Sequence, residues 1–257
     1  MRFASLGSGS DGNGLLVECS EGTTTTRVLL DCGFSLKETV KRLARLSIDA
    51  ASLTAIVITH EHADHIGGAL SLARRFSIPL HMSWGTALAT GAPVAGVQLK
   101  LCESDQAFNV GDLNILPFTV PHDAREPLQY VFSDGRVRLG VLTDAGSATA
   151  HITNVLSGCD ALILECNHDR QMLAQSRYPA SLKSRIGGSH GHLSNDTAAK
   201  ILQSLDRSRL RRLIAAHLSQ ENNLPSLALG ALAAVMGSTP EELYAATQHD
   251  GFDWMVI

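Results

Sequence analysis

The stretch THEHADH (59–65) places three histidines and an aspartate directly after an apolar run that is typical of a buried strand. His60 and His62 alternate, so an extended backbone points both rings to the same side. Asp64 and His65 come after a turn and can face a second ion. Imidazole nitrogens and carboxylate oxygens are ligands that suit zinc. A solvated, histidine-rich loop is the alternative, but it would leave several polar groups at a strand end without a role, so the stretch predicts a metal site.

The order of strand, turn and helix patterns around this stretch divides the chain into two similar halves. In the first half, the strand RVLLDCG (27–33) ends in Asp-x-Gly, and a helix leads to the strand that precedes His60. In the second half, LGVLTDAG (139–146) ends in the same way, and a helix leads to the strand DALILECNH (160–168), which ends in a histidine. We interpret this order as an internal pseudo-repeat, which predicts two β/α layers packed face to face.

Helix start signals mark several segments between the expected strands. Ser35 opens a helix through a capping box, and Ser147 opens another. Later helices are expected over 194–205 and 224–236, and a short final one begins at Thr239-Pro240. Strands and helices therefore alternate, as in an α/β fold.

Composition and charge place the chain among ordinary globular proteins. Its 257 residues are 44% hydrophobic and 18% charged, so we expect one domain spanning 1–257. The net charge of -4 excludes a basic surface over the whole molecule, and nucleic-acid binding would need a local basic surface. Five cysteines form no C-x-x-C pair and indicate reduced thiols. The first residues lack a basic-then-apolar leader, and the longest apolar run (227–236) is too short for a bilayer, so we expect a cytoplasmic protein without a membrane partner.

A glycine-rich stretch, LGSGSDGNGLLVE (6–18), has the G-x-G-x-x-G spacing of a dinucleotide-binding loop in Gly7, Gly9 and Gly12. Asp31 follows at about the distance of a ribose-binding acid. A dinucleotide fingerprint needs its glycines to open a helix, whereas these lead into a β-branched, hairpin-like run. We therefore expect no dinucleotide and a tight loop between the first two strands.

The H-x-H-x-D-H motif resembles that of the metallo-β-lactamase superfamily. Three later strand ends match the remaining ligands of that family: His122 in FTVPHDA, Asp144 in LTDAG and His217 in LIAAHLS. The resemblance implies an α/β fold, an αββα four-layer sandwich with an internal pseudo-two-fold repeat. It also implies one divalent ion on His60, His62 and His122. A second ion would lie on Asp64, His65 and His217, with Asp144 bridging the two.

Such a ligand set implies hydrolysis. Two ions joined by one carboxylate can hold a bridging hydroxide, which supplies a nucleophile near neutral pH, and Asp64 is counted among the catalytic residues for this reason. Zn²⁺ suits the ligands best, and Mn²⁺ or Fe²⁺ can occupy such sites. A phosphodiester, lactone, thioester or β-lactam could each be the substrate.

A second set of residues favours a phosphodiester. Glu165 ends the strand of LILECNHDRQML, and His192 precedes the helix of GGSHGHLSNDTAAKIL. These positions resemble the metallo-β-lactamase ribonucleases that mature tRNA 3′ ends, in which a glutamate orients a histidine that donates a proton. A phosphodiester leaving group is an alkoxide, so a nearby acid has a clear role. His168 is interpreted as a partner of this pair or as a phosphate contact, and a surface histidine is the alternative.

Further substrate contacts are expected in two segments. The segment 170–185 carries four basic residues and no acid, so Lys183 and Arg185 could contact phosphates while Tyr178 stacks on a base. A solvated loop is the alternative. In the glycine-rich loop the hydrogen-bonding side chains are expected to face a phosphate, with hairpin strain as the alternative reason for the glycines; these residues are Ser8, Ser10 and Asn13.

The combination of SLGSGSDGN, THEHADH, VPHDA, ECNHD, GHLSND and AHLSQENN resembles the WalJ/YycJ branch of the superfamily over nearly the full length. That resemblance implies exonuclease activity with a nucleic-acid substrate, DNA favoured over RNA. A small-molecule hydrolase, such as a glyoxalase-II-like thioesterase or a lactonase, explains the seven ligands equally well. It leaves Glu165, His192 and the basic segment without a role. A non-catalytic metal-binding module is a third reading, which the intact ligand set argues against.

Overall fold

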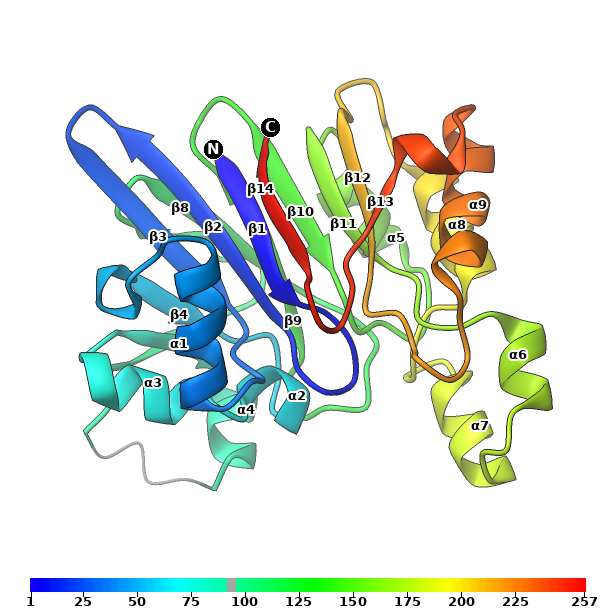
Figure 1. Ribbon diagram of the computed structural model, residues 1–257, viewed down its shortest axis with the longest axis horizontal. Helices are drawn as coiled ribbons and strands as arrows, with labels where there is room; N and C mark the ends of the chain where they lie inside the picture. Colours follow the sequence, from blue (N-terminus) through cyan, green and yellow to red (C-terminus); the bar gives the residue numbers. More distant parts are fainter. Residues whose placement is uncertain (92–95) are drawn as a thin grey trace.

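Apolar runs of the chain form two seven-stranded mixed sheets in the computed structural model, which describes residues 1–91 and 96–257. In spatial order the first sheet holds β14 (Phe252–Val256), β1 (Arg2–Gly7), β2 (Gly14–Glu21), β3 (Thr24–Leu30), β4 (Ala55–Val57), β5 (Leu80–Ser83) and β6 (Leu99–Cys102). The second holds β7 (Phe108–Val110), β8 (Leu113–Thr119), β9 (Leu128–Ser133), β10 (Arg138–Leu142), β11 (Ala161–Glu165), β12 (Arg212–Ala216) and β13 (Tyr244–Ala245). The two sheets lie face to face (Figure 1).

The pairing of the strands is the same in both sheets. From β14 to β3 the neighbours are antiparallel, and from β3 to β6 they are parallel. In the second sheet β7 to β10 are antiparallel and β10 to β13 parallel. The strand–helix–strand units predicted from the two Asp-x-Gly motifs are β3–α1–β4 and β10–α5–β11. The predicted internal repeat is therefore present in the topology.

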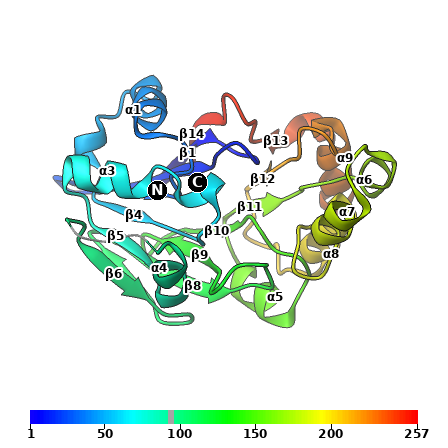
Figure 2. The same ribbon diagram turned by 90° about the horizontal axis from the view of Figure 1, so that it is seen from below.

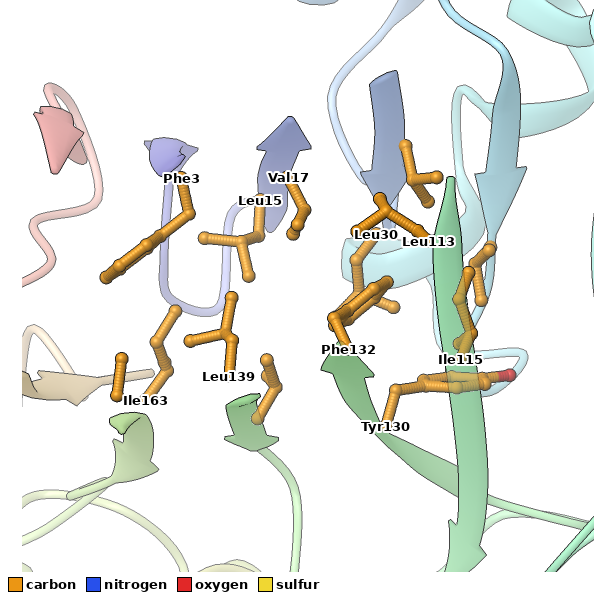
Figure 3. Close-up of a cluster of buried hydrophobic side chains, with 14 of the residues drawn as sticks. Phe3, Leu15, Val17, Leu30, Leu113, Ile115, Tyr130, Phe132, Leu139 and Ile163 are labelled. Carbon is orange, nitrogen blue, oxygen red and sulfur yellow. The ribbon is translucent and has the colours of Figure 1, made fainter. Parts of the chain in front are cut away.

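Side chains from the facing sides of the sheets form a central apolar core. Phe3, Leu15 and Leu30 from the first sheet pack against Phe132 and Ile163 from the second (Figure 3). Each of these side chains is buried, and such burial stabilises a fold by roughly 1.5–3 kcal/mol per large apolar side chain. The core holds the two sheets together as the inner layers of the molecule.

Helices cover the outer face of each sheet, so the molecule has four layers, αββα (Figure 2). The first sheet is covered by α1 (Leu36–Arg45) and α3 (Ala69–Phe76), and the short α2 (Ala63–Ile66) and α4 (Trp84–Ala89) follow β4 and β5. The second is covered by α5 (Ala150–Leu156), α8 (Asn195–Ser204) and α9 (Pro225–Met236). The helices α6 (Arg170–Gln175) and α7 (Ala180–Ile186) lie together at the lower end in Figure 1. Within the described ranges, no helix has the length and apolar character needed to cross a membrane.

The helix starts confirm some predictions and correct others. The Ser35 hydroxyl accepts a hydrogen bond from the first turn of α1, as the capping box predicted, and the Ser194 hydroxyl caps α8, the helix expected over 194–205. Helix α5 begins at Ala150 rather than Ser147, because the Thr149 hydroxyl caps it. The Ser147 hydroxyl instead donates to the carbonyl of Ser189. The segment 170–185 is not a loop, since most of it forms α6 and α7, and α7 has no buried residue. The expected final helix is a 3₁₀ turn, Pro240–Glu242, and a second such turn is Ala50–Ser52.

Both Asp-x-Gly motifs need glycine because another backbone passes close to it. A Cβ on Gly33 would lie 1.8 Å from the carbonyl oxygen of Asp64, and one on Gly146 would lie 2.4 Å from the backbone nitrogen of His190. The turns after β3 and β10 therefore bring α2 and the loop before α8 against the ends of the two sheets. The polar residues that follow β3, β4, β10, β11 and β12 meet there, at the carboxyl ends of the parallel strands.

Candidate active site

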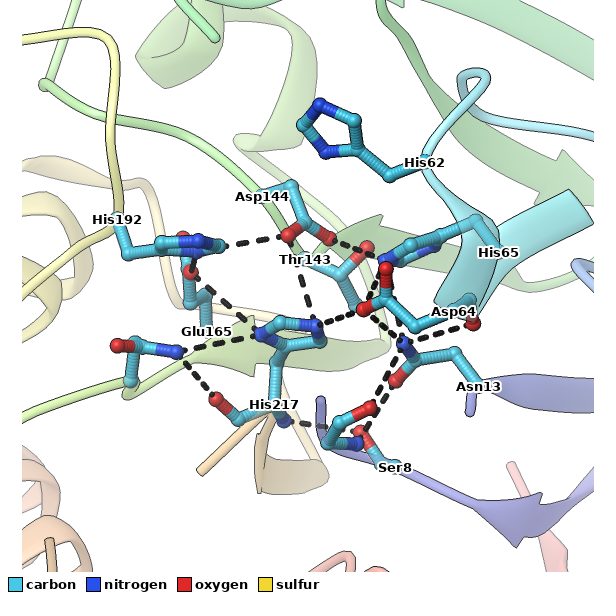
Figure 4. A network of polar contacts seen from close by, with 12 residues as sticks. Ser8, Asn13, His62, Asp64, His65, Thr143, Asp144, Glu165, His192 and His217 are labelled. Atoms are coloured by element: carbon cyan, nitrogen blue, oxygen red, sulfur yellow. Dashed lines mark hydrogen bonds and ion pairs between the residues drawn. The ribbon is translucent and has the colours of Figure 1, made fainter. Parts of the chain in front are cut away.

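All seven predicted metal ligands come together at this end of the sheets (Figure 4 shows Asp64, Asp144 and three of the histidines). The turn after β4 carries His60 and His62, and α2 carries Asp64 and His65. The remaining three follow β8, β10 and β12, one from each strand: His122, Asp144 and His217. Ligand atoms within 4.8 Å of one another form four overlapping groups, and two of these are the trios His60 with His62 and His122, and Asp64 with His65 and His217. The other two groups contain Asp144, once with His60 and His65 and once with Glu165, His192 and His217. The two trios are those that the resemblance implied.

In the first trio, imidazole nitrogens converge on one another. Nε2 of His60 lies 3.0 Å from Nδ1 of His62, and Nε2 of His122 lies 3.3 Å from the same Nδ1. The outer nitrogen of His122, Nδ1, lies 3.0 Å from the carbonyl oxygen of Gly191, which fixes the ring. Burial holds the pKa of His60 well below its ordinary value, and neighbouring histidines add to this effect. Neutral imidazoles with converging nitrogens are the donor set that a divalent ion requires.

The second trio is built around the Asp64 carboxylate. Its Oδ2 lies 3.3 Å from Nε2 of His65 and 3.4 Å from Nε2 of His217. Burial opposes ionisation of Asp64, but hydrogen bonds from His217 and His65 hold the pKa of this carboxyl well below its ordinary range. A carboxylate and two imidazoles thus face one point from α2 and from the end of β12.

Asp144 lies between the two trios and is almost fully buried. Its Oδ2 is 3.1 Å from Nε2 of His65, and its Oδ1 is 3.5 Å from Nε2 of His217 and 4.0 Å from Nε2 of His122. Apart from this ion-pair contact with His65, Oδ2 accepts no hydrogen bond in the described part of the chain. A buried carboxylate oxygen without a partner is costly unless a cation satisfies it. The donor set and this oxygen fit divalent metal ions.

Asp31 and Thr59 contact the candidate metal ligands and were not predicted as site residues. Oδ2 of Asp31 lies 2.8 Å from Nδ1 of His65, and its Oδ1 accepts hydrogen bonds from the backbone and hydroxyl of Thr59. With its Nδ1 proton held by Asp31, His65 presents Nε2 to the cluster. The signal for Asp31 was present in the sequence, because it occupies the same Asp-x-Gly position as Asp144.

The glycine-rich loop between β1 and β2 also contacts the ligands. The Asn13 amide donates to the backbone oxygen of Asp64 at 3.2 Å and to its Oδ2 at 3.3 Å. The Ser8 hydroxyl accepts from the backbone nitrogen of His217 at 2.9 Å. Ser8 and Asn13 are buried, so in this structure they hold ligands in place, whereas Ser10 is exposed and lines the cavity described below.

Packing accounts for two glycines of this loop. Gly9 and Gly12 have φ of 145° and 152°, and a Cβ on either would collide with Gln248 or Phe34. The loop needs these glycines for its own conformation, which supports the hairpin alternative for them.

Glu165 and His192 form a pair beside the metal cluster. Oε1 of Glu165 lies 2.7 Å from Nδ1 of His192, and its Oε2 accepts from the backbone nitrogens of Ala145 and Leu193. Burial opposes charging of His192, but the Glu165 carboxylate in contact with it raises the pKa of His192 to about 9. The contact with Glu165 favours the protonated form of the His192 ring, which stacks on the His217 ring with centroids 5.3 Å apart.

A cavity of about 390 Å³ lies over the metal cluster and the pair. Ser10, Asp64, Asp144, His192 and Arg185 are among the residues that line it. Nε of Arg185 lies 2.5 Å from Oδ2 of Asp123, which was not predicted. The Asp123 carboxylate is also 3.5 Å from Nε2 of His122, so it connects Arg185 to the first trio.

The other predicted substrate contacts lie farther out. His168 and Lys183 line a neighbouring cavity of about 450 Å³ on the other side of His192. Burial lowers the pKa of His168 to about 4, so its ring is neutral at pH 7. Tyr178 lies in the connection between α6 and α7 and is not among the described residues that line the two cavities.

Comparison with known proteins gives one matching family model and full-length relatives. The model for the β-lactamase superfamily domain matches residues 26–218. The exodeoxyribonuclease YycJ of Bacillus anthracis is 33% identical over 92% of this chain and 89% of its own length. The exodeoxyribonuclease WalJ of Streptococcus pneumoniae is 33% identical over 88% and 85%. Among solved structures, the metallo-β-lactamase fold protein YhfI of Bacillus subtilis superposes with a TM-score of 0.75 at 18% identity, over 99% of each chain.

Proposed function

The chain belongs to the metallo-β-lactamase superfamily of metal-dependent hydrolases, and on this premise we propose that it hydrolyses phosphodiester bonds of nucleic acid as a DNA exonuclease. The observation that carries the proposal is the Glu165–His192 pair. It places an imidazole, held at Nδ1 by a carboxylate, on the wall of the same cavity that the candidate metal ligands line. Hydrolysis of a substrate whose leaving group is stable as an anion does not need such a proton donor. Hydrolysis that releases an alkoxide does need one.

Two divalent ions are proposed for the two trios, with Asp144 between them. Bound there, they would lower the pKa of water and neutralise charge that develops on the phosphate. The first ion is assigned to His60, His62 and His122, and the second to Asp64, His65 and His217. Zn²⁺ suits nitrogen and carboxylate ligands, and Mn²⁺ or Fe²⁺ are compatible with the same set.

The proton path is proposed to run through His192. Glu165 accepts from Nδ1 and fixes the orientation of the ring, so Nε2 carries the proton available for the leaving oxygen. Glu165 is fully buried and held by the two backbone amides, which keeps its carboxylate from turning away. Glu165 therefore acts as a positioning residue and His192 as the acid.

Three further observations support nucleic acid as the substrate. The relatives that match over most of the chain are named exodeoxyribonucleases. The neighbouring cavity is lined by basic Arg170 and Lys183 and by no acid among the described residues. Arg185 lies at the edge of the cavity over the metal cluster. Basic groups near the reacting centre are what a phosphate backbone requires.

The test compares three substrates with one preparation of metal-loaded protein. End-labelled duplex DNA, bis-p-nitrophenyl phosphate and a thioester are incubated separately, and products of the DNA are resolved by length. The proposal expects shortening of the DNA from an end and hydrolysis of the phosphate diester. Hydrolysis of the thioester alone would support the small-molecule hydrolase instead and contradict the proposal.

A further inference from the structure

A second cavity lies directly behind the proposed proton donor. It has a volume of about 450 Å³ and is lined by residues of α6, α7 and the beginning of α8. His192 lines both this cavity and the one over the candidate metal ligands, so the two cavities adjoin at this imidazole. A substrate whose leaving oxygen meets His192 therefore has this second cavity beside its leaving group.

His168 in this cavity is a buried polar side chain without a partner. Only 3% of its surface is exposed, and the backbone around it is fixed by a hydrogen bond from the Asn195 nitrogen to the His168 carbonyl. Its Nδ1 is buried and has no hydrogen bond in the part of the chain that the structure describes. A buried imidazole of this kind costs free energy unless a ligand or water satisfies it. His168 also lines the cavity, so a ligand with hydrogen-bonding oxygens bound there could supply the missing partner.

The positive charges around the cavity favour binding of an anion. Arg170 and Lys183 line it, and the lining residues in the described ranges include no aspartate or glutamate. Nε of Arg170 donates to the Ser194 hydroxyl at the start of α8, which also lines the cavity. Nη2 of Arg170 donates to the Thr197 hydroxyl at 3.1 Å, and the nearest counter-charge is the exposed Asp196 carboxylate, 3.5 Å from Nε. These bonds leave Nη1 to bind another oxygen. The ten-residue helix α8 presents its positive end to the same space.

We propose that this cavity is a phosphate subsite, in which Arg170, Lys183 and His168 bind the phosphate next to the scissile one on the leaving-group side. The proposal rests on the proposed function for the identity of the substrate, and names the part of the strand that the cavity binds. A nucleotide that spans from the metal cluster past His192 carries its second phosphate into this space. Two phosphates bound at once would fix the register of the strand, so that cleavage removes one nucleotide at a time.

The first experiment measures binding and needs no turnover. Thymidine 3′,5′-bisphosphate and the two thymidine monophosphates are titrated into the metal-loaded protein by calorimetry. The bisphosphate carries two phosphates one nucleotide apart and is expected to bind at least about tenfold more tightly than either monophosphate, because charge-assisted hydrogen bonds add to its affinity. This gain in affinity of the bisphosphate over the monophosphates should disappear in Arg170→Gln and in Lys183→Gln.

The matched control is Arg177→Gln. Arg177 lies in the same basic segment, between α6 and α7, but is not among the residues that line the cavity. This variant should keep the gain. Equal affinity of bisphosphate and monophosphates in the unchanged protein, a gain that survives both cavity variants, or a gain lost equally in Arg177→Gln would each overturn the subsite. Thermal unfolding of all three variants checks that the fold is retained.

The second experiment uses DNA ends. Duplexes that carry or lack the terminal phosphate at one end are compared by kcat/KM, and the subsite predicts a preference for one phosphorylated end of about tenfold. In Arg170→Gln and Lys183→Gln the ratio of kcat/KM for the phosphorylated duplex to kcat/KM for the unphosphorylated duplex should fall toward one. If the chain does not cleave DNA at all, the proposed function fails, while the bisphosphate titration still decides the subsite. If it cleaves DNA with the same ratio in all variants, the subsite fails and the proposed function stands.

Discussion

Asp31 and Asp144 occupy the same place in the two halves of the molecule. Each follows the last strand of the antiparallel part of its sheet, in an Asp-x-Gly turn, and each has a left-handed backbone with φ of 60° or 62°. The Asp31 carboxylate is fully engaged with Thr59 and His65. The Asp144 carboxylate faces the cluster with one oxygen that no hydrogen bond satisfies in the described residues. The same turn therefore supplies support in the first half and a candidate metal ligand in the second.

The two halves also contribute different residues to the site. The first half contributes the dense motif after β4, with Asp31 and the loop residue Asn13 beneath it. The second half contributes Glu165 and His192, which lie where a leaving group can be protonated. The two halves therefore share their strand order but contribute different chemical groups to the site. Substitutions in the two halves should therefore have different consequences.

The largest effect is expected for Asp144→Asn. The change removes the charge that lies between the two trios, so metal content should fall below two ions per chain and DNA cleavage should fall by about 10⁴-fold or more. Elemental analysis and the end-labelled duplex assay measure the two quantities. Excess metal should not restore activity. An Asp144→Asn protein with full metal content and activity would remove Asp144 from the centre.

His192→Ala is expected to come next, and its effect should depend on the substrate. Cleavage of DNA should slow by about 10³-fold, because the alkoxide loses its acid, whereas hydrolysis of bis-p-nitrophenyl phosphate should slow much less. The leaving group of the second substrate needs no proton. Parallel kinetics on the two substrates give the ratio. An equal loss on both would argue that His192 acts by packing against His217 and not as an acid.

Asp31→Asn should reduce activity less than Asp144→Asn and His192→Ala do, and it tests whether Asp31 and Asp144 have different roles. Loss of the carboxylate weakens the hold on His65, so metal affinity and activity should fall by about 10–100-fold. Unlike Asp144→Asn, this variant should recover activity as the metal concentration rises. Activity is titrated against metal for both proteins. If Asp31→Asn cannot be rescued, the two aspartates play the same part and the comparison fails.

The smallest effect concerns stability and a residue that only the first half carries. His81 in β5 is 5% exposed and stacks on Phe108, whereas the buried part of β12, the corresponding strand of the second sheet, is apolar. Burial, together with Lys100, lowers the pKa of His81 to about 4. The unfolded chain therefore binds more protons than the folded chain between about pH 6.5 and 4, and stability falls as the pH drops through this window.

The contribution of His81 to this loss is about 2 kcal/mol by pH 5, measured by urea unfolding across the pH range. His81→Phe should make this part of the profile less steep by that amount, while buried His168, whose pKa is also lowered to about 4, keeps its own contribution. His249→Gln, at an exposed position, serves as the control and should leave the profile unchanged. A profile that keeps its slope in His81→Phe would show that other groups cause the acid sensitivity.

Much of the fold and of the metal cluster could be predicted from local patterns. The His60–His65 motif is contiguous, and the two Asp-x-Gly turns mark both halves of the repeat. The partners of Asp31 and the Arg185–Asp123 contact could not be predicted, because they depend on how strands and loops far apart in the sequence meet. The direction of the side chains in the β1–β2 loop could not be predicted either, because an irregular backbone has no periodicity that tells which way a side chain points. This is why Ser8 and Asn13 were expected to face a substrate and instead hold His217 and Asp64.

The most direct test of the account is to count metal ions and measure DNA cleavage in the same preparation. Elemental analysis should find two divalent ions per chain, and the protein should shorten end-labelled duplex DNA. Removal of the ions by a chelator should abolish cleavage, and their return should restore both quantities together. Cleavage of DNA that persists in protein shown to be free of metal would contradict the account.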